Sequence, residues 1–268
     1  MIRTTQVSRR KESAMVPFLF GVAGADEIPG VVLVRLLEDL GLTASAARAC
    51  IARLRGAGFL ASSPNGRAVA YRLDGSFAEA FRRIRDGRER AAWTGAFHAV
   101  LYQVPEADRA FRDALRWSSL MSGYGQLQPG VLIALRDRTA AIAPVLERRP
   151  PGARVFVTRL AMDAGDAARA AHAAWDLDGL GALYGAHIES LERAAAVGPE
   201  TAEPGAAALR RFADLARGPM TDTLRDPGLP AELLPADWAG SRLRAAIGRV
   251  NALFGPPAAT YVRGLLRP

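Results

Sequence analysis

The chain has 268 residues, half of them hydrophobic, and its mean hydropathy of +0.04 is typical of a folded globular protein rather than a disordered one. Its formal net charge of +8 favours a polyanionic partner such as nucleic acid, although so many arginines beside one lysine are also typical of a GC-rich genome. Cys50 is the only cysteine, which excludes an internal disulfide and a cysteine-based zinc site and favours a cytoplasmic protein.

The N-terminal stretch imitates a secretory signal. Residues 1–14 are polar and are expected to form a flexible arm, whose basic residues precede an apolar run over 15–25. This run is too short to span a bilayer, and a proline and a glycine interrupt it. We therefore expect a short first helix over 15–22 within a folded domain, and no membrane association.

Two further helices follow at short spacing. Apolar residues at helical intervals predict a helix over 31–40, which Gly41 ends in the manner of a C-terminal glycine. Thr43 or Ser45 then caps a third helix that runs to residue 57. The short connection between these two helices is typical of a helix-turn-helix.

The third predicted helix has two contrasting faces. At 100° per residue, one side gathers its apolar residues, namely Ala47, Cys50, Ile51, Leu54 and Ala57. The other side and its flank gather hydroxylated and cationic residues, namely Ser45, Arg48, Arg53 and Arg55. Small residues beside arginines let a helix enter a DNA groove while guanidinium groups reach phosphates or guanine edges. Alone, this pattern is more often an ordinary solvated face, so the neighbouring elements decide.

A β-hairpin follows this helix. The spacing predicts a strand over 59–61 and another over 68–73, joined by the turn signal Asn65-Gly66. Three helices followed by a hairpin is the order of a winged helix-turn-helix. In such a fold Asn65 and Arg67 belong to the wing, where we expect contacts with the DNA backbone or the minor groove.

The rest of the chain predicts two more domains, so that the fold class is α+β. A linker helix over 77–90 completes a winged-helix domain over 15–90. Residues 91–162 follow a β-α-β-β-α-β order, which is the ferredoxin-like pattern. Residues 163–268 are mostly helical, with one helix over 241–253 and another from residue 257 onward.

Catalytic and metal-binding motifs do not occur. The chain has no phosphate-binding loop with its lysine, no nucleophile elbow and no metal-ligand spacing among its three histidines. The first strand of the ferredoxin-like segment also ends without the carboxylate that a metal nuclease of this fold requires. We therefore expect no enzyme, no metal and no cofactor. Two alternatives stay open: a small-molecule enzyme, which a histidine and carboxylate converging in a pocket would favour, and a regulator controlled by protein partners.

Several stretches together resemble the PaaX family of phenylacetate-pathway repressors. In chain order they are LLEDLG over 36–41, ARACIARL over 47–54, GFL over 58–60, GR over 66–67, YRL over 71–73, GYGQLQPG over 123–130 and DPGLPAELLPADWAG over 226–240. The last run is the most specific of these, and the match extends over nearly the whole chain.

The resemblance implies a regulator with two kinds of ligand. It implies a homodimeric transcriptional repressor that binds palindromic double-stranded operator DNA, and release by a CoA thioester, typically phenylacetyl-CoA. Candidate residues for an effector pocket are Trp175, Tyr184, His187 and Trp238. Aromatic residues at helical spacing are more often part of a core or an interface, so this alternative stays open for each of the four.

Overall fold

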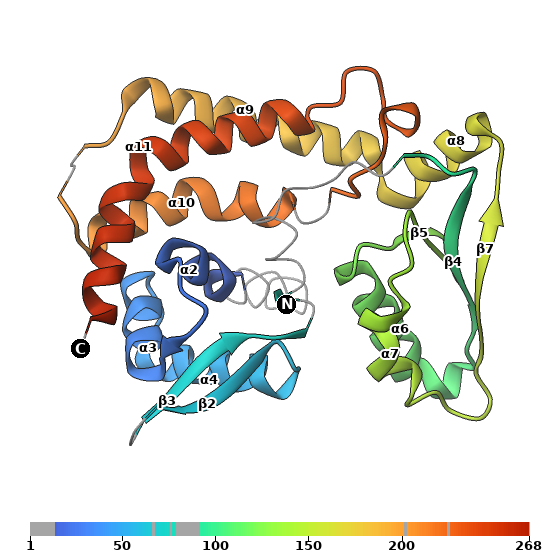
Figure 1. Ribbon diagram of the computed structural model, residues 1–268, viewed down its shortest axis with the longest axis horizontal. Helices are drawn as coiled ribbons and strands as arrows, with labels where there is room; N and C mark the ends of the chain where they lie inside the picture. The colour runs from blue at the N-terminus through green and yellow to red at the C-terminus, as the bar shows by residue number, and fades with distance from the viewer. Residues whose placement is uncertain are drawn as a thin grey trace. The chain divides into compact units, whose positions relative to one another are not determined.

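The computed structural model describes residues 14–65, 68–75, 77–78, 92–200, 203–223 and 226–267. The chain divides into two compact units. Unit 1 combines residues 1–81, 186–221 and 241–268, and unit 2 combines residues 82–185 and 222–240. The α+β class is confirmed (Figure 1). Residues 1–13 of the predicted arm and most of the predicted linker helix over 77–90 lie outside the described residues.

The first part of unit 1 is a winged helix-turn-helix, as predicted. Its helices are α2 (Met15–Ala23), α3 (Gly30–Asp39) and α4 (Ala44–Gly56), and its strands are β1 (Ile28–Pro29), β2 (Leu60–Asn65) and β3 (Ala68–Leu73). The sheet order is β1-β3-β2, with both pairs antiparallel. The sequence does not predict β1, because two residues are too few for a strand periodicity, and β1 forms only by pairing with β3.

The second part of unit 1 is helical. It contains the C-terminal part of α9 (Leu177–Val197), most of α10 (Ala206–Thr223) and nearly all of α11 (Gly240–Leu266). The expected break before residue 257 is wrong, since α11 continues through Pro256 and Pro257. Each proline removes one helical hydrogen bond and displaces the preceding turn. In agreement with this, Figure 1 shows that α11 changes direction along its length.

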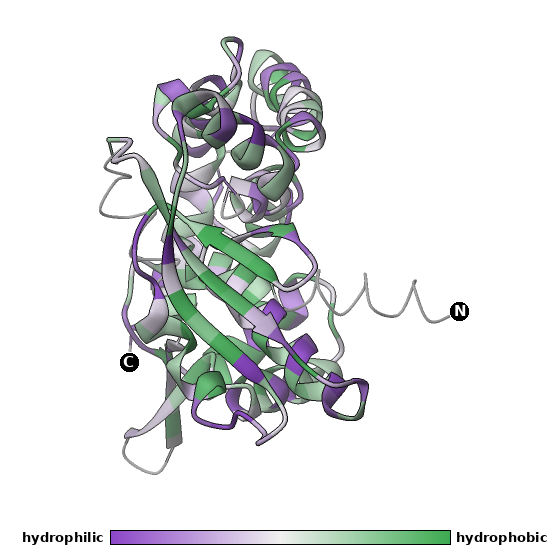
Figure 2. Ribbon diagram, turned by 90° about the vertical axis from the view of Figure 1, so that its right-hand side faces the viewer, coloured by the Kyte–Doolittle hydropathy of each residue, from purple (hydrophilic) through white to green (hydrophobic). Residues whose placement is uncertain are grey.

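Unit 2 has the predicted ferredoxin-like order. It runs β4 (Ala96–Gln103), η1 (Glu106–Asp108), α6 (Arg109–Met121), β5 (Gly125–Gln128), β6 (Val131–Ala134), α7 (Thr139–Leu146) and β7 (Arg154–Ala161). The antiparallel sheet has the order β5-β6-β4-β7, so β5 and β7 are its edges. Figure 2 shows hydrophobic residues running along the strands of this sheet.

Two cores fill unit 2, one on each face of the sheet. On one face, Val100 and Leu132 pack with residues of α6 and α7. On the other, Phe97 and Ile133 pack with α8 (Ala164–Trp175). Leu229 and Leu233, which were expected in a helical C-terminal domain, join this second core. The distinctive run over 226–240 therefore packs on α8 and the sheet, and the predicted domain boundaries themselves stay predictions.

Gly125 explains part of the GYGQLQPG run. A methyl group at this position would lie 2.7 Å from Cε2 of Trp175 and 2.8 Å from the carbonyl oxygen of Ala174. Real Cβ atoms do not approach other atoms so closely, so only glycine lets α8 pack directly on β5. Gly130, with φ +82°, makes the turn that follows β5.

We expect Gly125→Ala to lower the free energy of unfolding of unit 2 by about 1–3 kcal/mol, because α8 must move away from β5. The four tryptophans of the chain all belong to unit 2, so urea denaturation followed by tryptophan fluorescence reports on this unit. Gly185→Ala is the control: a methyl group there meets no atom within 4 Å, and alanine favours the helix by up to about 1 kcal/mol. Equal stability of the two variants would contradict this account of Gly125.

Candidate nucleic-acid interface

A tight turn positions α4 relative to α3. Gly41, with φ +95°, reverses the chain, and the backbone N–H of Leu42 donates to the carbonyl oxygen of Leu37 at 3.1 Å. Thr43 is the N-cap of α4, since its side-chain oxygen accepts a hydrogen bond from the N–H of Ala46 at 3.2 Å. Of the two predicted caps, Thr43 is the one used. Its hydroxyl also lies 3.1 Å from that of Ser45.

The two faces of α4 are separated as predicted. Its apolar face is buried against the rest of the domain, through Ala47, Cys50, Ile51 and Leu54. Ala57 is the exception, because it is the C-cap and is exposed. The opposite face and its flank are exposed and contain Ser45, Arg48, Arg53 and Arg55. Since α4 carries three arginines and no acidic residue, this side of the helix is uniformly positive.

The wing is only partly described. β2 and β3 pair from Leu60↔Leu73 to Asn65↔Ala68, which places Asn65 at the end of the ladder. Arg67, the other predicted wing contact, lies outside the described residues. Arg72 on β3 is exposed and adds a cationic side chain to the hairpin. Contacts of Asn65 and Arg67 with DNA stay predictions.

A buried carboxylate connects the helix-turn-helix to the C-terminal helices of unit 1. Asp39, at the end of α3, is 7 % exposed, and its Oδ2 accepts a hydrogen bond of 2.7 Å from the Tyr261 hydroxyl of α11. Arg35, one turn earlier on α3, forms an ion pair with the same carboxylate, with 3.3 Å between Nε and Oδ1. The carbonyl oxygen of Asp39 accepts from Nε of Arg210 on α10 at 3.0 Å. A negative charge is unfavourable at a helix C-terminus, and these donors offset that cost.

This junction also affects Tyr261 itself. Burial, followed by the hydrogen bond to Asp39, raises the pKa of the Tyr261 phenol, so that it remains a donor at neutral pH. A second contact joins the same parts of unit 1, since the rings of Phe18 and Phe212 lie 5.4 Å apart. No pattern in the sequence predicts this junction. The only local signal is an acidic residue in the last turn of a helix.

The four candidate effector residues fall in different surroundings. In unit 2, Tyr184 is fully buried, and its ring lies 5.4 Å from that of Trp238. Trp175 is packed 6.1 Å from Phe97. His187 belongs to unit 1. The role of these residues in binding an effector stays a prediction.

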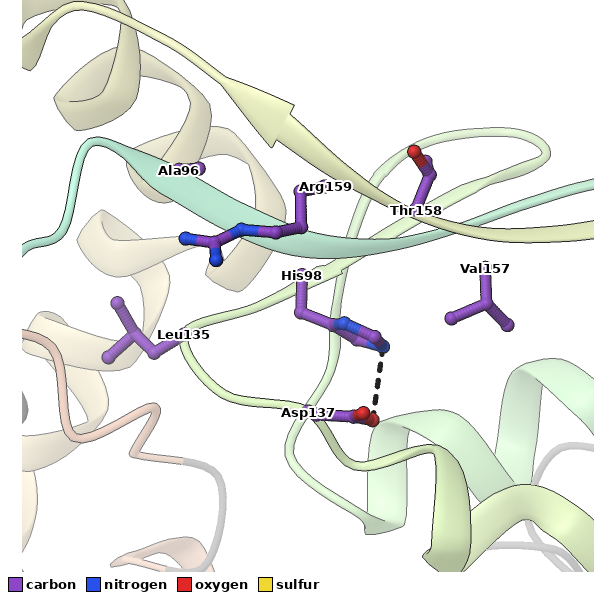
Figure 3. A pocket seen from close by; sticks show the side chains of 7 residues that line it. All are labelled: Ala96, His98, Leu135, Asp137, Val157, Thr158 and Arg159. Atoms are coloured by element: carbon purple, nitrogen blue, oxygen red, sulfur yellow. Dashed lines mark ion pairs between the residues drawn. The ribbon is translucent and has the colours of Figure 1, made fainter.

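An open hollow in unit 2 is lined by other residues. It has a volume of roughly 450 Å³, and its lining is Ala96, His98, Leu135, Asp137, Val157, Thr158 and Arg159 (Figure 3). His98 Nε2 lies 3.3 Å from Oδ1 of Asp137. The three histidines are far apart in the sequence and show no motif. Only the fold brings His98 close to Asp137, which is 39 positions away. No group of three or more potential metal ligands occurs within the described part of the chain.

Three models of one protein family match successive segments of the chain. Family models described as "PaaX-like protein", "PaaX protein central Cas2-like domain" and "PaaX-like protein C-terminal domain" match residues 13–76, 90–171 and 175–264. The chain is 27 % identical over 245 residues to the Transcriptional repressor PaaX of Escherichia coli strain K12, which covers 86 % of this chain and 75 % of that protein. Among the helices that the structure describes, none is long and apolar enough to span a membrane.

A solved structure is also similar. The Uncharacterized protein Rv0674 from Mycobacterium tuberculosis matches with a TM-score of 0.50 and 26 % sequence identity. The similarity covers 87 % of this chain and 89 % of that one. It therefore extends over both units rather than over the winged helix alone.

We expect Tyr261→Phe to loosen α3, because the buried Asp39 carboxylate loses a hydrogen-bond donor worth about 1–3 kcal/mol. Hydrogen exchange of the backbone amides of α3 should become faster by the corresponding factor. Thr260→Ala, at the exposed neighbouring position of α11, should leave this exchange unchanged. Slow exchange retained in the Tyr261→Phe variant would show that the junction does not stabilise the helix-turn-helix.

Proposed function

The chain belongs to the PaaX family, and from this premise we propose that this PaaX-like transcriptional regulator is a cytoplasmic repressor of a catabolic operon. It binds double-stranded operator DNA as a homodimer, and a small-molecule effector of the acyl-CoA class releases it. The observation that carries DNA binding is the exposed side of α4, which combines three arginines, small residues and no carboxylate.

The chemistry of α4 suits groove recognition. Ala49 and Ala52 are exposed beside the arginines, and their small side chains permit close approach of the helix to DNA. We propose that Ser45, Arg48 and Arg55 face the major groove and that Arg53 contacts a phosphate. Guanidinium groups form bidentate hydrogen bonds with guanine O6 and N7 and with phosphate oxygens. Asn65 and Arg67 of the wing supply further contacts to the DNA backbone or the minor groove.

A dimer follows from the requirement for specificity. One recognition helix reads only a few base pairs, and two-fold symmetric regulators read two half-sites about one helical turn apart or a multiple of that spacing. The similarity to a transcriptional repressor supports the DNA-binding role, and the dimer itself is proposed from this requirement alone.

Release requires that the effector distinguish two forms of the protein. A ligand shifts an equilibrium only by its difference in affinity for the two states. We propose that phenylacetyl-CoA or a related thioester binds the form whose half-site spacing does not match the operator. Trp175, Tyr184, His187 and Trp238 are the aromatic candidates for its acyl group.

The geometry around His98 does not support the enzyme alternative. In a hydrolytic triad, one ring nitrogen of the histidine faces the nucleophile and the other donates to the carboxylate. Here the Thr139 hydroxyl, at 3.1 Å, and the Asp137 carboxylate, at 3.3 Å, both face Nε2. A proton on Nε2 that serves the carboxylate prevents this nitrogen from accepting one from the hydroxyl. This supports binding rather than catalysis at the hollow.

We expect Arg48→Ala and Arg55→Ala each to weaken operator binding by about 1–3 kcal/mol and, where the lost contact is to a phosphate, to reduce the salt slope by about one. Fluorescence anisotropy with the intergenic DNA upstream of the protein's own gene, at several salt concentrations, measures both quantities. Arg242→Ala removes the same charge from an exposed position of α11 and is the control. Binding of the wild type no tighter than to random DNA, or equal losses in all three variants, would contradict the proposal for this operator.

We expect phenylacetyl-CoA to release the wild-type protein from this DNA, whereas CoA alone does not, because the acyl group supplies the difference in affinity between the two forms. The same anisotropy experiment with added ligand measures this effect. Specific binding that persists at saturating thioester would retain the regulator and reject this effector class.

A further inference from the structure

The hollow lies on a part of the central sheet beyond its helical cover. α6 and α7 pack over Val100 and Leu132, whereas His98, two residues earlier on β4, lines the hollow. Arg159 on β7 is the cross-strand partner of His98, and Val157 is the partner of Val100. Side chains directly opposite each other on antiparallel strands point to the same face. All seven lining residues belong to unit 2.

His98 is held in a fixed orientation. Its side chain is 12 % exposed, and Nε2 lies 3.1 Å from the Thr139 hydroxyl and 3.3 Å from the Asp137 carboxylate. The backbone N–H of Thr139 donates to Oδ1 of Asp137 at 2.8 Å. Hydrogen bonds from the side chain and backbone of Thr139 lower the pKa of Asp137, so this carboxylate is ionised at neutral pH.

Arg159 is in a different electrostatic situation. Its side chain is exposed, and in Figure 3 the guanidinium extends away from the His98 ring, which points toward Asp137. β7 itself contains no acidic residue. Within the described residues it has no ion-pair partner. The hollow therefore contains two basic groups at adjacent cross-strand positions, of which only His98 has a carboxylate.

A buried hydroxyl group, that of Tyr124, lies close to the residues that face His98. The Tyr124 side chain is 1 % exposed, and its hydroxyl lies near Thr139 and Asp137. Among the described residues it has no hydrogen-bond partner of good geometry. Tyr124 does not line the hollow, so this buried hydroxyl is not one of the groups that a ligand there would contact.

We propose that this hollow binds a small organic anion, whose carboxylate or phosphate group pairs with Arg159 beside His98. A planar guanidinium recognises either anionic group by two parallel hydrogen bonds. Ala96, Leu135 and Val157 supply an apolar surface for the rest of the molecule. A role of this ligand as the effector rests on the proposed function, whereas its binding is tested separately.

The size of the hollow limits the ligand. About 450 Å³ is at the lower end of the range of small-molecule sites. This volume suits a free organic acid or one phosphate-bearing end of a larger molecule, and not a complete CoA thioester.

Isothermal titration calorimetry of the full-length protein with three probes tests the proposal. The probes are phenylacetate, its neutral analogue phenylacetamide, and inorganic phosphate. We expect an anionic probe to bind the wild type, with phenylacetamide weaker by about tenfold or more, and Arg159→Gln to lose at least about tenfold in affinity for that anion. Arg154→Gln removes the same charge from another exposed position of β7 outside the hollow and should bind as the wild type does.

The probes distinguish the two sources of the anionic group. Selective binding of phenylacetate indicates an organic acid, and binding of phosphate that depends on Arg159 indicates a phosphate-bearing ligand. The proposal is overturned if neither anion binds, or if Arg154→Gln loses as much affinity as Arg159→Gln. Operator binding by Arg159→Gln, measured in parallel without ligand, separates this result from a failure of the DNA-binding proposal.

Discussion

The buried carboxylate of Asp39 is the constraint on which the arrangement of unit 1 depends. Asp39 is the last residue of α3, the helix that precedes α4. Tyr261 of α11 donates to its side chain, and Arg210 of α10 donates to its backbone carbonyl oxygen. A buried charge is tolerated only when hydrogen bonds and opposite charges satisfy it. The helix-turn-helix and the C-terminal helices therefore belong to one compact unit, although 171 positions separate Asp39 from Arg210 and 222 separate it from Tyr261.

Unit 2 also combines segments that are distant in sequence. Its sheet and helices are contiguous in sequence, but Leu229 and Leu233 come back from beyond α10 to complete a core with α8. Gly125 permits the close contact of α8 with β5. The run over 226–240 thus has a packing role, because its leucines and Trp238 pack in the core that the sheet and α8 form.

The two proposed sites use different chemistry. α4 presents an exposed side with three arginines and no carboxylate, which suits a polyanion whose phosphates are spread along a groove. The hollow beside β7 combines a guanidinium that has no ion-pair partner among the described residues with a histidine that already has its carboxylate. Coupling between two such sites is defined by the effect of one ligand on the affinity for the other.

Local periodicity accounts for the features that could be predicted from the amino-acid sequence. The helices and hairpin of the winged helix, the β-α-β-β-α-β order and the exposure of Arg48 and Arg55 follow from patterns that repeat over two to four residues. Tertiary contacts establish the pairing of Asp39 with Tyr261, the two residues of β1 and the continuous course of α11. They also return 226–240 to the central sheet and bring His98 to Asp137. Each of these depends on contacts between residues distant in sequence or on packing that overrides a local signal, and no single segment encodes such a contact.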